Sequence, residues 1–163
     1  MWHDDPRQYV ECYRYLYLCS MFSKTFGYAL RATVYVAVHG ESDKKVGLQE
    51  ISEGLMVPRH FLGKIMQDLV RHGILDSVKG PSGGFYPNSG TLDTRLINIL
   101  KITDGSLMFD HCALGITRCN AASPCPLHDD FSSCRNGMLQ SLSEKTVGML
   151  AEEVEAGKSF LVR

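Results

Sequence analysis

The sequence predicts a mostly α-helical fold with one small β-hairpin, arranged as a winged helix-turn-helix and followed by a long C-terminal helix. Three observations support this prediction. Apolar residues recur at helical spacing in three segments between residues 25 and 72. A glycine-rich turn then separates two short runs typical of strands. A last helical pattern covers about residues 127–156.

The first three helices follow one another closely. Residues 25–39 have helical spacing, and Gly40 suits the end of that helix. Apolar residues at positions 48, 51 and 55 predict a short second helix. Pro58 then opens a third helix, because proline lacks only an N–H that the first turn leaves unbonded, and Gly73 ends it.

The third helix has two different faces. A broad apolar stripe is expected to face the core and consists of Phe61, Leu62, Ile65, Met66, Leu69 and Val70. The opposite face offers hydrogen-bond donors, positive charge and a glycine, at His60, Gly63, Lys64, Gln67 and Arg71. Taken alone, such a face is more typical of a solvated helix than of a binding surface.

The segment after the third helix favours a binding surface. Residues 74–86, "ILDSVKGPSGGFY", predict a strand, a tight turn and a second strand. In a winged helix-turn-helix, the second helix of the pair enters the major groove of DNA, and a wing can meet phosphates. We therefore predict a DNA-binding domain over residues 21–105. Its candidate contacts are Lys24, Arg59, His60, Lys64, Gln67, Arg71, Lys79 and Ser82.

Two further helices complete the chain. The fourth is expected from about Asp93 to Thr103. The last is expected as one helix over 127–156, with an apolar stripe at Phe131, Cys134, Met138, Leu142 and Met149. A long terminal helix with an exposed apolar seam is typical of a dimer interface, so residues 129–163 are assigned to a dimerisation helix and tail.

The charge balance gives a weak indication of the binding partner, and the first twenty residues bear on location. The net charge is −1, with eight Lys and Arg against six Asp and Glu in residues 21–91, a weakly basic balance. Residues 1–20 are expected to be a disordered extension or a start-site artefact. They lack the pattern of a signal peptide, and no apolar run is long enough to span a membrane, which predicts a cytoplasmic protein.

The loop over residues 106–128 contains "CALGITRCNAASPCPLH", with the spacing C-x6-C-x5-C-x2-H. Clustered cysteines in the cytoplasm more often bind metal than form disulfides. Structural zinc usually takes cysteine pairs two to four residues apart, and only Cys125 and His128 have that spacing. A two-iron cluster is wider and accepts longer spacings. An iron–sulfur cluster, zinc and free redox thiols all remain open from the residues alone.

Three stretches carry a family resemblance: "YALRATVYVAVHG", "LQEISEGLMVPRHFLGKIMQDLVRHGIL" and "SVKGPSGGFY". The chain from residue 21 resembles the Rrf-two family of bacterial transcription regulators, most closely its IscR-type members. The resemblance implies a [2Fe-2S] cluster held by Cys112, Cys119, Cys125 and His128. Two positions depart from IscR-type members: Cys112 lies one residue further from the next cysteine, and Gly63 stands where they have an acid.

The resulting expectation is a homodimeric regulator, not an enzyme, that binds a palindromic operator in double-stranded DNA. We expect a repressor whose affinity depends on a [2Fe-2S] cluster sensing redox state, nitric oxide or iron–sulfur supply. The alternatives are a cluster-free or zinc-stabilised regulator that uses its cysteines as a thiol switch, and a thiol redox or electron-transfer protein.

Overall fold

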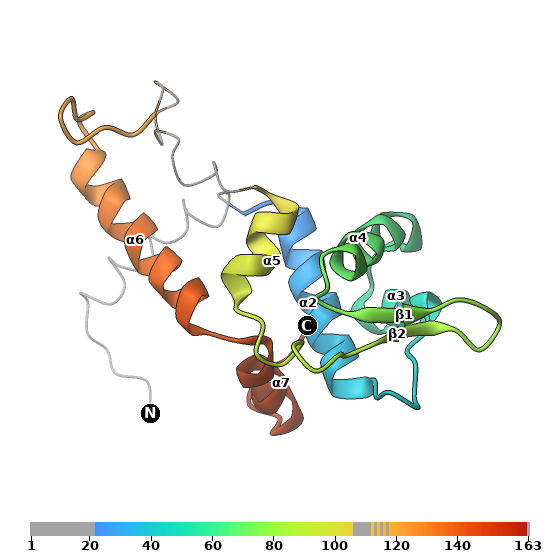
Figure 1. Ribbon diagram of the computed structural model, residues 1–163. Coiled ribbons are helices and arrows are strands. Elements are labelled where there is room, and N and C mark those ends of the chain that lie inside the picture. The colour runs from blue at the N-terminus through green and yellow to red at the C-terminus, as the bar shows by residue number, and fades with distance from the viewer. Residues whose placement is uncertain (1–21, 106–111, 113, 115, 117, 163) are drawn as a thin grey trace.

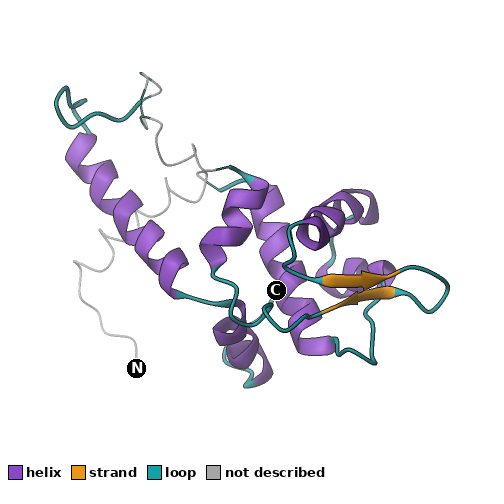
Figure 2. Ribbon diagram, viewed as in Figure 1, coloured by secondary structure: helices purple, strands orange, loops and turns teal. Residues whose placement is uncertain are grey.

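The computed structural model describes residues 22–105, 112, 114, 116 and 118–162, so the expected extension over 1–20 lies outside the described residues (Figure 1). Helices predominate, and the one sheet in this part of the chain is a hairpin (Figure 2). The helices are α2 (Lys24–His39), α3 (Leu48–Leu55), α4 (Arg59–Arg71), α5 (Leu96–Thr103), α6 (His128–Glu144) and α7 (Val147–Glu155); the strands are β1 (Asp76–Val78) and β2 (Gly84–Tyr86).

Helix α2 is the centre of the core and packs against α3, α4, α5 and α7. Its N-cap is Ser23, whose hydroxyl accepts a hydrogen bond from the Phe26 amide at 3.0 Å. The Asp104 carboxylate, at the end of α5, accepts from the Ser23 amide at 3.0 Å and also from the Ser23 hydroxyl. This carboxylate ties the end of α5 to the positive end of α2.

The hairpin is antiparallel, with Asp76 opposite Tyr86 and Val78 opposite Gly84. The backbone of Val46, from the loop before α3, pairs with Phe85 through hydrogen bonds of 2.8 and 2.9 Å. Gly84 permits this approach, because a Cβ at that position would lie 2.6 Å from the Val46 carbonyl oxygen. The base of the hairpin is therefore held to the helical core.

A small polar group holds the chain that leaves the hairpin. Thr91 is fully buried, and its hydroxyl donates to the Ile74 carbonyl at 2.7 Å and accepts from the Asn88 amide at 2.8 Å. The Asn88 side chain donates to the Gly73 carbonyl at 3.0 Å. These bonds set the position of the hairpin relative to the end of α4.

Two predicted helix boundaries are wrong for a single physical reason. The helix expected from Asp93 begins at Leu96, and the helix expected over 127–156 is divided into α6 and α7. Residues 92–96 and 145–148 pair through their backbones, with hydrogen bonds of 2.9 to 3.1 Å. The backbone is extended at Arg95, Lys145 and Thr146, which interrupts the helical pattern there, and Thr146 then caps α7 by accepting from the Met149 amide.

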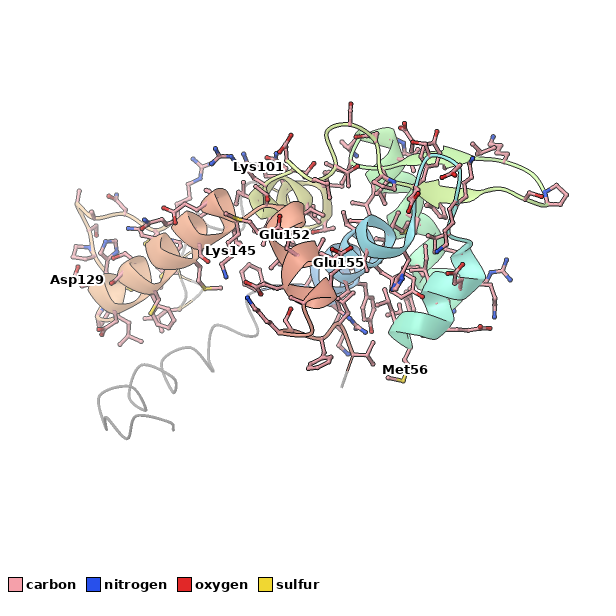
Figure 3. The ribbon with its side chains drawn as sticks, turned by 90° about the horizontal axis from the view of Figure 1, so that it is seen from below. Met56, Lys101, Asp129, Lys145, Glu152 and Glu155 are labelled. Atoms are coloured by element: carbon pink, nitrogen blue, oxygen red, sulfur yellow. The ribbon has the colours of Figure 1, made fainter. Side chains whose placement is uncertain are left out.

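Helix α6 stands apart from the other helices, and α5 is its main contact (Figure 1). None of the residues of α6 is fully buried. Met149, from the expected apolar stripe, lies on α7 and is exposed. The other four stripe residues lie on α6 and are half-buried, namely Phe131, Cys134, Met138 and Leu142. Figures 1 and 3, at right angles, place the start of α6, near Asp129, and the hairpin at opposite ends of the molecule. No helix in the described ranges is both long and apolar enough to cross a membrane.

Candidate functional site

Helix α4 presents one face to the core and another to solvent, as predicted. Leu62, Ile65, Met66 and Leu69 are buried, whereas His60, Lys64, Gln67 and Arg71 are exposed. The assignment of Phe61 to the core is wrong: its side chain is 56% exposed. It lies at the margin of the apolar stripe, and its ring centroid is 4.1 Å from that of His60.

Three of the predicted DNA-contacting side chains surround one cavity of about 520 Å³ between α2, α4 and α5. They are Lys24 from the start of α2, and His60 and Lys64 from the exposed face of α4. Phe61 lines the same cavity. The two lysines bring positive charge to this surface, which suits an anionic partner such as DNA, and Asp68 brings one carboxylate.

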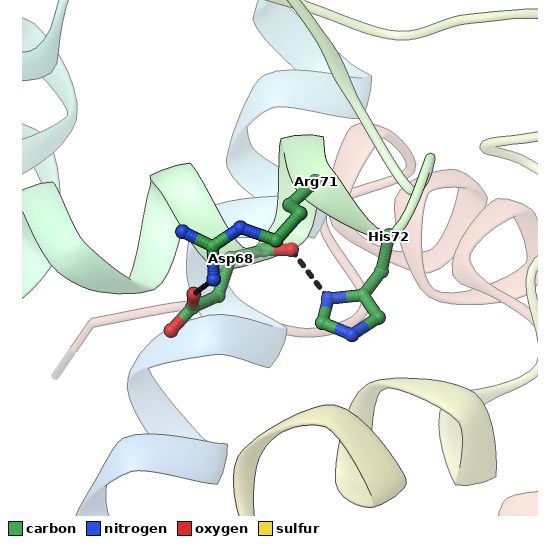
Figure 4. Close-up of polar contacts among 3 residues, drawn as sticks. All are labelled: Asp68, Arg71 and His72. Atoms are coloured by element: carbon green, nitrogen blue, oxygen red, sulfur yellow. Dashed lines mark hydrogen bonds and ion pairs between the residues drawn. The ribbon is translucent and has the colours of Figure 1, made fainter.

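The C-terminal end of α4 is organised by Asp68 (Figure 4). The Asp68 carboxylate accepts a hydrogen bond from the Arg71 guanidinium at 2.8 Å, and the Asp68 carbonyl lies 2.8 Å from Nδ1 of His72. The ion pair is exposed, so it contributes little to stability. Arg71 is thus held along the helix by a partner that the sequence did not indicate.

The remaining predicted contacts lie on both sides of α4. Lys79 and Ser82 are exposed on the loop that joins β1 to β2. Arg59, at the first position of α4, donates to the side-chain oxygen of Gln49 in α3 at 3.4 Å. All eight side chains predicted to contact DNA are therefore exposed. Gln49 lies beside this surface, and the sequence pattern did not identify it.

The four predicted cluster ligands line a second cavity, of about 570 Å³, at the far end of α6. Cys112 is buried, and Cys119, Cys125 and His128 are half-buried. The Sγ atom of Cys119 lies 3.3 Å from Nδ1 of His128, the first residue of α6. Cys134, from the apolar stripe of α6, is also a free thiol and is half-buried.

The thiol of Cys112 is stabilised in its charged form. Hydrogen bonds from the backbone amides of Leu114 and Ile116 lower the pKa of the Cys112 thiol, and burial partly opposes them. A hydrogen bond from Cys125 and the positive charge of Arg135 lower this pKa further. Thiolates are the form of cysteine that binds metal.

The four donors form two pairs. Cys112 contacts Cys125, Cys119 contacts His128, and both pairs line the same cavity. Within the described ranges, no three His, Cys, Asp or Glu side chains surround one point closely enough to hold a single metal ion. Three thiols and an imidazole around one cavity are donors that either a two-iron cluster, in which each iron takes two protein ligands, or a zinc ion can take.

Comparison with known proteins identifies the family. The Rrf2 family model, described as an iron-dependent transcriptional regulator, matches residues 22–153. An HTH-type transcriptional regulator of Aquifex aeolicus (strain VF5) is 31% identical over 118 residues, 71% of this chain and 81% of the relative. The regulator IscR of Vibrio atlanticus (strain LGP32) is 26% identical over 128 residues, 78% of this chain and 73% of that protein.

A solved structure supports the fold independently of sequence. CymR of B. subtilis, a global cysteine regulator, superposes with a TM-score of 0.66 and 17% identity, covering 80% of this chain and 95% of CymR. This likeness confirms the predicted winged-helix architecture, and the family match over residues 22–153 confirms the predicted resemblance. The chain therefore belongs to the Rrf2 family of transcriptional regulators.

Proposed function

We propose that this regulator is a homodimer whose affinity for a palindromic operator depends on a [2Fe-2S] cluster. The observation that carries the proposal is the cavity at the start of α6, where three free thiols and an imidazole converge. IscR-type relatives support the same assignment. The cluster ligands would be Cys112, Cys119, Cys125 and His128, and bound there the cluster would supply one-electron redox chemistry.

DNA would be bound by the exposed face of α4 and by the wing. His60, Lys64, Gln67 and Arg71 would face base edges, because the second helix of such a pair enters the major groove. Lys24, Arg59, Lys79 and Ser82 would contact phosphates and fix the orientation on the duplex. A protein that binds chromosomal DNA in this way would act in the cytoplasm of its cell, where it would repress transcription.

Helix α6 would form the dimer interface and connect the cluster to DNA. Its apolar stripe is half-exposed in the single chain, and a second copy of α6 would cover it. The start of α6, where His128 lines the cysteine cavity, lies far from the wing (Figure 1), so an effect of the cluster on DNA would travel through α6 and α5. A change in the distance between the two DNA-binding domains of the dimer is one physical route for that effect.

The first experiment is to measure iron and acid-labile sulfide per chain in protein purified without oxygen. Two irons and two sulfides are expected, with visible absorption from sulfide-to-iron charge transfer. The second is to compare operator binding by cluster-loaded and cluster-free protein at one stated salt concentration. Equal affinities would contradict control by the cluster and leave DNA binding in place.

A second function is favoured by the contact between Cys112 and Cys125. Their thiols share a hydrogen bond, and a two-electron oxidant such as a peroxide could join them as a disulfide, with loss of both thiol protons and without a cluster. A well-folded dimer without iron, whose operator affinity changes on oxidation and recovers with a dithiol reductant, would establish this thiol switch instead.

A further inference from the structure

Besides the imidazole of His128, helix α6 directs one positively charged side chain, Arg135, at the cysteine site. Arg135 follows His128 by seven residues, close to two helical turns, so both side chains lie on the same face of α6. The Arg135 guanidinium donates a hydrogen bond to the Cys119 sulfur at 3.3 Å. One helix face therefore carries a proposed cluster ligand and a cation directed at a second ligand.

The charge of Arg135 also reaches a second sulfur. Its electrostatic influence contributes to the lowered pKa of Cys112, so two of the three proposed thiolate ligands lie within its field. Arg71 is paired with a carboxylate on its own helix, whereas Arg135 has no carboxylate partner among the described residues. Its side chain is half-buried, so solvent screens its charge less than that of an exposed residue.

We propose that Arg135 is a positioning residue that raises the reduction potential of the cysteine site through its positive charge and its hydrogen bond to Cys119. The inference rests on the proposed [2Fe-2S] cluster. Three thiolates and a neutral imidazole leave such a site with net negative charge, and reduction adds one electron that converts one ferric ion to ferrous without breaking a bond. A nearby cation and an N–H donor to sulfur both favour the more negative state.

The test is a redox titration of the cluster-loaded protein, in which the electron comes from an electrode through soluble mediators. R135M removes the charge and the donor but keeps a long side chain, and R135K keeps the charge. R118M is the matched control, because Arg118 lines the same cavity but is exposed and has no sulfur contact among those described. We expect R135M to lower the equilibrium constant for reduction about tenfold, which corresponds to about 59 mV.

We expect R135K to lie between R135M and the wild type, and R118M to stay near the wild type. A wild-type potential in R135M, or an equal shift in R118M, would overturn the assignment. If R135M holds no iron, retention by R135K supports the role of the charge, whereas loss from both variants shows a packing role and overturns it. A wild-type protein without iron and sulfide refutes the proposed cluster itself, so the two failures are distinguishable.

Discussion

Replacement of Lys79 by alanine tests whether the wing contacts DNA phosphates. Lys79 follows β1 directly, is exposed, and has no acidic partner in the part of the chain that the structure describes. Each phosphate that a protein neutralises contributes about 0.9 to the slope of log affinity against log salt concentration. A dimer has two wings, so the variant should lose about 1.8 from that slope. Between about 50 and about 200 mM salt, the ratio of wild-type to variant affinity should fall about twelvefold.

The assay is fluorescence anisotropy of a labelled duplex at several salt concentrations, with both operator and unrelated sequence. The loss should be equal for the two duplexes, because phosphate contacts carry no base information. Lys145→Ala is the matched control: Lys145 is exposed at the end of α6, away from the wing (Figure 3). An unchanged slope in the Lys79 variant, or an equal change in the Lys145 variant, would refute the reasoning.

Three further predictions concern specificity, stability and the cluster. Gln67→Ala should cost about 1–3 kcal/mol at one base pair of the operator and leave the salt slope unchanged, as a panel of single-base operator variants will show. Thr146→Ala should lower the free energy of unfolding by about 1 kcal/mol in urea denaturation, because the Met149 amide loses its acceptor at 3.3 Å; Thr146→Ser keeps the hydroxyl and should stay near the wild type. His128→Cys should release iron to a chelator more slowly than the wild type, since a thiolate replaces a neutral ligand; equal release rates would count against His128 as the fourth ligand.

The order of elements from α2 to β2 followed from local patterns. Helical spacing, Pro58 and the glycines that end α2, end α4 and form the wing act over a few residues, so one sequence was enough to place them. The boundary between α6 and α7 depended on pairing between residues 92–96 and 145–148, which are distant in the sequence. The exposure of Phe61 likewise depended on which neighbours pack around α4.

For the candidate site, the sequence by itself determined the chemistry available: three thiols, one imidazole, and a helix face rich in donors and positive charge. Only the tertiary structure decided that Cys119 lies 3.3 Å from His128 and 3.3 Å from Arg135, and that Asp68 holds Arg71. It also decided that the start of α6, which lines the cysteine cavity, and the wing lie at opposite ends of the molecule (Figure 1). Residue type and spacing determine local conformation and which chemical groups are available for binding. Distances between segments are set by the packing of the core against α2 and by the direction in which α6 leaves the core.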